Sequence, residues 1–268
     1  MKFAIGFVIY NPENNHLKQI KQIVTSNLFE VCMIYDNSQK KHNLSYITED
    51  NYFYNGINDG LPKAYNCFLH RCKLKHIDYL CIMDQDSTFE CDEIKKMQDA
   101  IIRNNNFLAN CALVAPRSYI ITASHHPTRK DKFTNVEYVI NSGSFLNLRC
   151  LCSNNLKYDE NIYLDGVDYD FCKSAHSKNM NILIYEGSFL QQRLGYSRYF
   201  FGKGISCHNV TRHYYMAKAR KYNCQKHFNK IKGIFFYLYK TMGHLLLVLL
   251  FEDHKYIKIK VIISTLIE

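Results

Sequence analysis

The sequence predicts an α/β fold with a mostly parallel sheet flanked by helices, and three observations support this. Short, continuously apolar runs alternate with segments in which apolar residues recur at helical spacing. Each apolar run is closed by polar turn residues, which is typical of strands buried on both faces. The chain has 268 residues, 47% of them hydrophobic, so it can bury a large core, and a collagen-like or disordered protein is excluded.

The first 117 residues show this alternation most clearly. In order, we expect strand 3–10, helix 17–24, strand 31–35, helix 61–76, strand 79–83, helix 94–101 and strand 111–115. Helix 61–76 illustrates the pattern, since Leu61, Tyr65 and Leu69 recur every four residues on one face. Pro116 is expected to end the strand that precedes it.

Beyond residue 118 the pattern is less regular. We expect strands at 136–140 and 145–148, a helix at 168–179 and a strand at 182–185. Residues 187–211 contain four glycines among polar and aromatic residues, which predicts a mobile loop.

Polar clusters follow three of the predicted strands. They are Asn11-Pro12, Asp36-Asn37-Ser38 and Asp84-Gln85-Asp86-Ser87. Ligands of open α/β sheets bind outside the carboxyl ends of the strands. We therefore expect these clusters to meet at one crevice.

Two acidic clusters could carry chemistry. Asp84 and Asp86 can together hold a hard divalent cation and leave places for phosphate oxygens, although turn or capping acids would look the same. Asp168 and Asp170 stand at a predicted helix start. They either cap that helix or supply a general base.

The end of the chain differs from the rest. Residues 212–268 account for +8 of the formal net charge of +10, which favours an anionic partner such as a nucleotide, a membrane surface or a nucleic acid. Residues 234–251 are nearly all apolar. A narrow stripe at helical spacing is more polar: Lys230, Gly233, Tyr237, Lys240 and His244. This pattern fits a helix in a membrane interface, a core helix or a short membrane-spanning helix.

Six segments in this order resemble family 2 glycosyltransferases, and within them the rhamnosyltransferase-like group. The segments are Phe7–Pro12, Asp36-Asn37-Ser38, Asn58–Asn66, Asp84–Ser87, Ser142-Gly143-Ser144 and Asp165–Cys172. A late basic and aromatic motif, Arg212-His213-Tyr214-Tyr215, is also similar. The resemblance covers residues 1–220 and rests on the combination of motifs, because none is specific alone.

The resemblance implies a GT-A fold and an inverting transfer that uses Mg²⁺ or Mn²⁺. By position, Tyr10 and Asp36 would hold the nucleobase, and Asp84 would lie on the ribose side of the donor. Asp86, together with Asp84, would bind the metal. Lys63 would contact the diphosphate, and Asp168 matches the general base of the family.

The resemblance also implies three parts. Residues 1–117 would form the nucleotide-sugar-binding half and 118–225 the acceptor-binding half, with 226–268 as a basic amphipathic segment. The partners would be a nucleoside diphosphate sugar, a glycan or lipid-linked glycan, and a membrane surface, with no nucleic acid. The expected role is sugar transfer, with rhamnose a candidate sugar, in cell-surface polysaccharide synthesis. The eleven cysteines lack C-x-x-C spacing, which indicates reduced thiols and a cytoplasmic protein. The C-terminal segment would associate it peripherally with the inner face of the membrane.

Three departures from the family pattern bear on activity. Many relatives have Arg where Tyr65 stands, so the diphosphate would depend more on the metal or on Lys63. Gln192 replaces a His that often contacts the metal or diphosphate, and Val167 replaces the Glu of a Glu-Asp pair. The alternative hypothesis is therefore a non-catalytic nucleotide-binding protein of the same fold. A nucleic-acid binder is suggested by charge alone.

Overall fold

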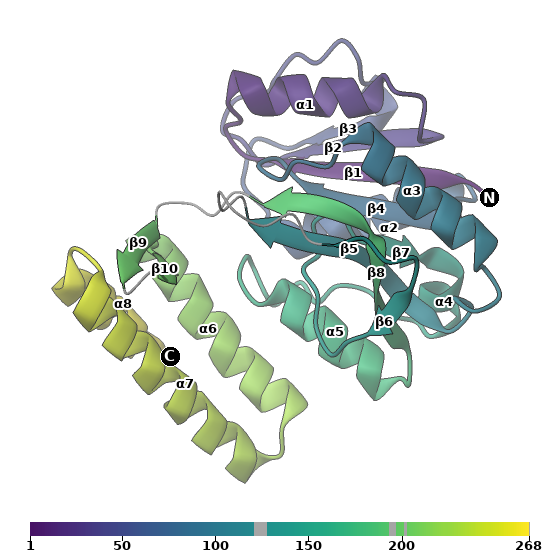
Figure 1. Cartoon of the computed structure of the whole chain (residues 1–268). Helices are drawn as coiled ribbons and strands as arrows, with labels where there is room; N and C mark the ends of the chain where they lie inside the picture. Colours follow the sequence, from purple (N-terminus) through teal and green to yellow (C-terminus); the bar gives the residue numbers. More distant parts are fainter. Residues whose placement is uncertain (121–127, 193–196, 201–202, 268) are drawn as a thin grey trace. The chain divides into compact units, whose positions relative to one another are not determined.

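The computed structural model describes residues 1–120, 128–192, 197–200 and 203–267. The chain divides into two compact units (Figure 1). The first, here called the sheet unit, comprises residues 1–158 and 171–193, and the second, the helical unit, comprises 159–170 and 194–268. The functional division at residues 117 and 225 remains a prediction.

Among the described residues, eight strands form the sheet of the sheet unit. They are β1 (Phe3–Ile9), β2 (Val31–Asp36), β3 (Tyr52–Tyr54), β4 (Tyr79–Asp84), β5 (Cys111–Ile120), β6 (Phe133–Asn135), β7 (Phe145–Asn147) and β8 (Asn181–Gln192). Their order is β3-β2-β1-β4-β7-β5-β8-β6. Strands β3, β2, β1 and β4 are parallel, β5 is parallel to β8, and β7 and β6 are antiparallel to their neighbours. The prediction of a mostly parallel α/β sheet is confirmed.

Helices cover both faces of this sheet. They are α1 (Asn14–Val24), α2 (Leu61–Leu74), α3 (Cys91–Arg103), α4 (Leu148–Ser153) and α5 (Val167–Ser177), with a 3-10 turn at Glu49–Asn51. The odd-numbered side chains of β1 pack in one cluster with apolar residues of α1 and α3. Gly6 points to the other face, where a Cβ atom would lie 2.4 Å from the Phe68 ring of α2. Only glycine allows α2 to approach β1 this closely, and the two helix layers are visible in Figure 1.

Two expected strand boundaries are wrong. Pro116 does not end its strand, because β5 continues to Ile120 after a register shift between Pro116 and Arg117. Proline lacks the N–H of a regular ladder but is tolerated at such a bulge. The strand expected at 136–140 lies instead at β6, where residues 133–135 pair with the edge of β8. Val139 is buried without belonging to a strand, and its burial produced the misleading apolar run.

The expectation of one loop over 187–211 is also wrong for most residues that are described. β8 extends to Gln192, and β9 (Ser197–Phe200) pairs antiparallel with β10 (Lys203–Ser206). The extension of β8 pairs with β5 beyond its bulge, a long-range partner that local composition does not reveal. Residues 193–196 and 201–202 lie outside the described part of the chain.

The helical unit contains this hairpin and, in its described part, α6 (Val210–His227), α7 (Lys230–Phe251) and α8 (Lys255–Ile267). A helical C-terminal extension is therefore confirmed. The apolar cluster between these helices is small: Ala217, Val248 and Ile262, with Leu245 and Ile259 against it.

A buried polar network occupies much of the remaining interior. Arg220 donates to Nδ1 of His244 at 3.0 Å, and Nε2 of His244 lies 2.8 Å from Nδ1 of His213. Nε2 of His213 lies 3.0 Å from the Glu252 carboxylate, which also accepts a hydrogen bond from Lys258 at 2.6 Å. Because arginine can only donate, Nδ1 of His244 accepts the hydrogen bond from Arg220. Burial and the Arg220 charge lower the pKa of His244 to about 4.

Helix α7 exposes its apolar side chains, whereas a core helix of a soluble protein buries them. Its buried residues are Gly233, Thr241, His244 and Val248. Its exposed side chains include Phe235, Leu238, Met242, Leu246 and Leu250. Among the described residues it is the one helix long and apolar enough to cross a membrane, and 17% of its most apolar stretch is buried. Of the polar stripe expected from the sequence, Gly233 and His244 are buried, whereas Lys230 and Lys240 are exposed. The exposed apolar side chains of α7 argue against the core-helix interpretation.

Glu93 ties α3 to β8 and should contribute measurably to the stability of the sheet unit. Its carboxylate accepts two hydrogen bonds from Arg129, both 2.8 Å, and one from the backbone N–H of Phe189 at 2.9 Å. Burial raises the pKa of Glu93, but the hydrogen bonds from Arg129 and Lys96 outweigh it and lower the pKa to about 2. The stabilisation is therefore fully present above pH 4.5 and is lost as the pH falls toward 2.

We expect Glu93→Gln to lower the free energy of unfolding by about 1 kcal/mol at neutral pH, because it removes the charge of a buried carboxylate whose partner Arg129 is half exposed to solvent. Urea unfolding at pH 7 and pH 3 checks this, and the difference from wild type should shrink at the lower pH. Glu90→Gln, at an exposed glutamate before the same helix, is the matched control. An equal loss in both variants would show that the pair is not specifically stabilising.

Candidate active site

The carboxyl ends of β1, β2 and β4 lie at one edge of the sheet, where the sequence predicts the crevice. In the parallel register, Ile9 pairs with Asp36 and Val8 pairs with Asp84. Asp36 and Asp84 therefore lie within one residue of the same level, and Asn11 follows two residues after the level of Asp36. This confirms that the fold brings Tyr10, Asp36 and Asp84 to the same edge.

Gln85 clamps the exit of β1 to the turn after β4. Its side chain accepts a hydrogen bond from the backbone N–H of Tyr10 at 2.8 Å and donates one to the carbonyl of Tyr10 at 3.1 Å. The next residue, Asn11, has a positive φ of 43° and donates its N–H to Ser38 at 2.7 Å. The clamp leaves the Tyr10 ring at the rim, 47% exposed, with one face able to stack against a flat ligand.

Asp36 is fully buried and surrounded by donors. Its carboxylate accepts hydrogen bonds from the backbone N–H groups of Ser38 at 2.9 Å and His42 at 3.2 Å, and from the Tyr52 hydroxyl. Burial raises the pKa of Asp36, but hydrogen bonds from Ser38, Tyr52 and His42 leave the pKa below its ordinary value. Asp36 therefore organises the chain after β2 as an ionised carboxylate. Its direct contact with the nucleobase of a donor remains a prediction.

The loop before α2 is fastened to the end of β2. Asn37 donates its side-chain N–H to the carbonyl of Gly60 at 3.2 Å and accepts from the N–H of Asp59 at 3.0 Å. Asp59 in turn accepts from the Tyr35 hydroxyl and from the ammonium of Lys63, both at 2.7 Å. The Lys63 side chain is 52% exposed, so its ammonium is held at the first turn of α2 without being buried.

Asp84 and Asp86 differ in exposure. Asp84 is partly buried, and its backbone N–H donates to the Ser142 hydroxyl at 3.1 Å. Ser142 also donates to Ser87 at 2.9 Å, so the turn that carries both aspartates is braced from the Ser142-Gly143-Ser144 segment. Asp86 is exposed. This bracing by Ser142 was not expected from the sequence, because a residue 55 positions away supplies it.

The donor set suits a magnesium or manganese ion that is held jointly with a ligand. No group of three or more His, Cys, Asp or Glu side chains in the described residues could hold a metal ion alone. Mg²⁺ is ordinarily bound by one or two carboxylates together with phosphate oxygens and water. Two carboxylates at a braced turn, one of them exposed, fit that mode of binding.

Gln192 lies close to the same turn. The backbones of Thr88 and Gln191 exchange two hydrogen bonds of 2.9 and 3.0 Å, which places the end of β8 two residues beyond Asp86. The position where relatives have His is thus near the aspartate pair. Residues 193–195, which follow it in the motif, lie outside the described residues.

The Tyr65 side chain does not reach the edge where Lys63 lies. Tyr65 is 1% exposed, and its ring packs against the Tyr158 ring with centroids 4.8 Å apart. This position therefore contributes to the core instead of supplying the cation that many relatives have there.

The predicted base and its neighbours belong largely to the helical unit. Asp168 lies in the first turn of α5 and is partly buried. Asp170 is 3% exposed and lies 2.8 Å from the Lys226 ammonium and 2.7 Å from Nε2 of His227. Such a buried, paired carboxylate has a structural role.

Asp165 is an acid that the sequence analysis did not single out as a base. One of its oxygens accepts from Arg212 at 3.2 Å, and the other is buried without a hydrogen-bond partner in the described structure. Burial raises the pKa of Asp165, and the Arg212 charge offsets only part of this effect. A raised pKa and an unpaired oxygen are both properties of a general base.

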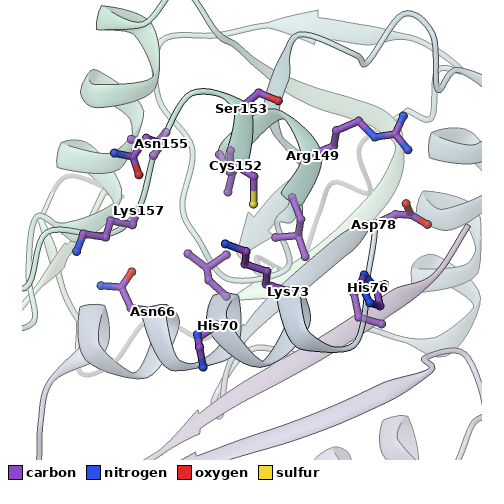
Figure 2. Close-up of a pocket in the computed structure, with 15 residues that line it drawn as sticks. Asn66, His70, Lys73, His76, Asp78, Arg149, Cys152, Ser153, Asn155 and Lys157 are labelled. Carbon is purple, nitrogen blue, oxygen red and sulfur yellow. The ribbon is translucent and has the colours of Figure 1, made fainter.

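A cavity of about 580 Å³ lies at the opposite edge of the sheet, between α2 and α4. In Figure 2, Lys73 extends from α2 toward Cys152 of α4, and Asp78, which precedes β4, marks the amino end of that strand. This cavity is therefore separate from the carboxyl edge that holds the predicted site residues.

Comparisons with known proteins agree with the fold described above. The family model described as glycosyl transferase family 2 matches residues 8–152. No curated protein matches the chain. The structure is similar to that of S. aureus TarS 1-349, with a TM-score of 0.54 and 11% identity over 99% of this chain and 81% of that one.

Two further TarS structures are similar. S. aureus TarS 1-349 in complex with UDP-GlcNAc has a TM-score of 0.54 and 13% identity, over 99% of this chain and 80% of that one. For S. aureus TarS the values are 0.52 and 11%, over 94% of this chain and 44% of that chain. Likeness at such low identity shows a shared GT-A fold.

Proposed function

The chain belongs to glycosyl transferase family 2, and we propose that it moves a sugar from a nucleoside diphosphate sugar to a hydroxyl of a glycan or lipid-linked glycan. We propose rhamnose as the first sugar to test, inversion at the anomeric carbon, and a role in cell-surface polysaccharide synthesis. The observation that carries the proposal is the meeting of Tyr10, Lys63, Asp84 and Asp86 at the carboxyl edge of one parallel sheet. The UDP-GlcNAc complex of TarS, a protein of similar fold, supports a nucleotide-sugar donor.

The donor would bind along this edge. The Tyr10 ring would stack on the nucleobase of the donor. Asp36 would bind the nucleobase directly or through the residues that Asp36 orders. Asp84 would lie on the ribose side, and Lys63, which is paired with Asp59, would face the diphosphate as a point charge. Asp86 and Asp84 would hold Mg²⁺ or Mn²⁺, which supplies charge neutralisation for the departing diphosphate.

The transfer itself needs a base and a leaving group. The acceptor oxygen forms a bond to the anomeric carbon while the bond from that carbon to the diphosphate oxygen breaks. The anomeric carbon develops oxocarbenium character, as in glycoside cleavage. We assign the acceptor proton to the carboxylate of Asp168.

A donor screen tests this proposal. The purified full chain is incubated with a panel of nucleoside diphosphate sugars, and released nucleoside diphosphate is measured with Mg²⁺ or Mn²⁺ present. Turnover of at least one donor is expected. Donor binding without turnover would favour the non-catalytic alternative, and salt-sensitive retention of DNA or RNA without donor binding would favour a nucleic-acid binder.

We also propose that the protein is cytoplasmic and that the helical unit associates with the inner face of a membrane. The apolar side chains of α7 point outward, and the segment around them is basic. An outward apolar face next to lysines suits an anionic lipid surface.

We expect the protein to float with vesicles that contain anionic lipid, and binding should weaken as salt screens the charges. The double variant Leu246→Ser/Leu250→Ser should reduce flotation about tenfold or more, since two exposed leucines of α7 would leave the bilayer. Leu74→Ser/Ile102→Ser changes two similarly exposed apolar residues of the sheet unit and serves as the control. Equal flotation of the α7 variant and wild type would contradict the proposal that the exposed face of α7 binds the membrane.

A further inference from the structure

Two adjoining cavities lie in the helical unit along α6. The first, of about 320 Å³, is here called the tyrosine cavity, and the second, of about 440 Å³, the apolar cavity. Lys221 and Gln225 line both of them. The two cavities therefore adjoin at these two side chains, and together they are called the groove.

The tyrosine cavity has the chemistry of a saccharide site. The rings of Tyr163 and Tyr215 stack with centroids 4.5 Å apart, and Tyr222 and Asn161 line the same wall. Asn161 donates to the Tyr222 hydroxyl at 3.2 Å. Flat aromatic faces pack against the apolar face of a sugar ring, and fixed amide and hydroxyl groups bond to its hydroxyls.

Three lysines line the groove, and one of them, Lys221, lines both cavities. Lys218 and Lys221 line the tyrosine cavity, and Lys221 and Lys230 line the apolar one. None of the residues described as lining either cavity is acidic, and Asp159, which accepts a hydrogen bond from Tyr222 at 2.8 Å, is paired with Lys226 at 2.6 Å. One of the three N–H groups of Lys221 donates to the carbonyl of Thr265 at 3.1 Å, which fixes the ammonium in place. The junction of the two cavities therefore favours an anion such as a phosphate.

The apolar cavity opens onto the exposed face of α7. Cys224, Gly233, Ile234 and Tyr237 line it, and Ile234 is 52% exposed. Phe235 and Leu238 continue this apolar surface outside the cavity. The Tyr237 hydroxyl is buried and has no hydrogen-bond partner in the described part of the chain, so this wall holds a polar atom that a ligand could satisfy.

We propose that this groove binds a lipid phosphate that carries a saccharide, and that it is the acceptor site. The order of chemistry along α6 matches the order in such a molecule: sugar at the tyrosines, phosphate or diphosphate at the lysines, hydrocarbon along Ile234 and the face of α7. The inference rests on the proposed function, because only a glycosyltransferase needs such an acceptor. It adds where the acceptor binds and which part of it is recognised.

Farnesyl diphosphate, a soluble lipid diphosphate, is the probe for this groove, and its binding to the full chain is measured by calorimetry without any donor. We expect it to bind at least about tenfold more tightly than either inorganic pyrophosphate or farnesol, because each of these lacks one half of the ligand. Equal affinity for pyrophosphate would show a simple anion site and overturn the proposal.

Matched variants locate the binding. Lys218→Gln/Lys221→Gln should weaken farnesyl diphosphate binding about tenfold or more, the effect of losing one charge-assisted hydrogen bond. Lys232→Gln/Lys240→Gln removes the same charge from exposed positions of α7 outside both cavities and should change it less than about threefold. Ile234→Ser should weaken binding more than Leu238→Ser, which has the same exposure of 52% but does not line the groove.

Equal effects within either pair would overturn the groove as the site, and thermal unfolding of each variant shows whether it remains folded. Because no donor is present, this experiment is independent of turnover. A donor screen that succeeds while farnesyl diphosphate fails to bind would overturn the acceptor groove and leave the proposed transferase standing.

Discussion

Asp86→Ala is expected to abolish sugar transfer while leaving the protein folded. Asp86 is exposed at a turn that Ser142 and Gln85 hold in place, so its carboxylate contributes little to the core. If it holds a divalent cation with Asp84, its loss removes several kcal/mol of stabilisation from the departing diphosphate. Each 1.4 kcal/mol is about tenfold in rate, so a fall of about 10³-fold or more should be seen in released nucleoside diphosphate.

Asp99→Ala is the control for this experiment, because it removes an exposed aspartate from the middle of α3. It should transfer sugar at the wild-type rate, and thermal unfolding should show that both variants are folded. Excess chelator should reproduce the loss in the wild-type protein. Undiminished transfer by Asp86→Ala, or by wild type in chelator, would remove the metal from the proposed reaction.

The gathering of the three polar clusters at one edge could be predicted because it depends on strand polarity alone. Asn11 follows β1, and Asp36 and Asp84 end β2 and β4, so parallel strands bring all three to the same edge. The short edge strands β3 and β6 were missed or misplaced for the opposite reason. Three residues have little pattern of their own, and their pairing with β2 and β8 decides their conformation.

The finer features of the site depend on contacts that the sequence does not display. Gln85 was visible between two aspartates, but its clamp on the backbone of Tyr10 requires β1 and β4 to be neighbours. Tyr65 fitted a helical apolar stripe, and its burial follows from that stripe rather than from the family motif. In α7 the sequence placed His244 on a polar stripe, but its burial depends on Arg220 and His213, which lie on α6.

Asp168→Asn is expected to lower the rate of transfer about 10²–10⁴-fold, the usual contribution of a positioned general base. Asparagine keeps the size of the side chain and some of its hydrogen bonding but cannot take the acceptor proton. Donor affinity should barely change, because the base acts on the acceptor. Single-turnover transfer, with donor binding by calorimetry beside it, separates the two effects.

Asp170 and Asp165 are the informative comparisons, and the structure assigns them different outcomes. Asp170→Asn should reduce stability in urea, because His227 loses its buried partner and Lys226 keeps only Asp159. Its folded fraction should transfer at a near-normal rate. Asp165→Asn should keep the fold and cost much less in rate than Asp168→Asn if Asp168 is the base.

The pH profile of the wild-type protein decides between Asp168 and Asp165. A general base works in its ionised form, so the rate falls as the pH drops below the pKa of the base. Burial raises the pKa of Asp165, so an Asp165 base would place this fall at a higher pH than an ordinary aspartate does. Three results together would identify Asp165 as the base: loss of transfer in Asp165→Asn, near-full transfer in Asp168→Asn, and a wild-type rate that falls at this higher pH. They would overturn the assignment of Asp168 from the family motif.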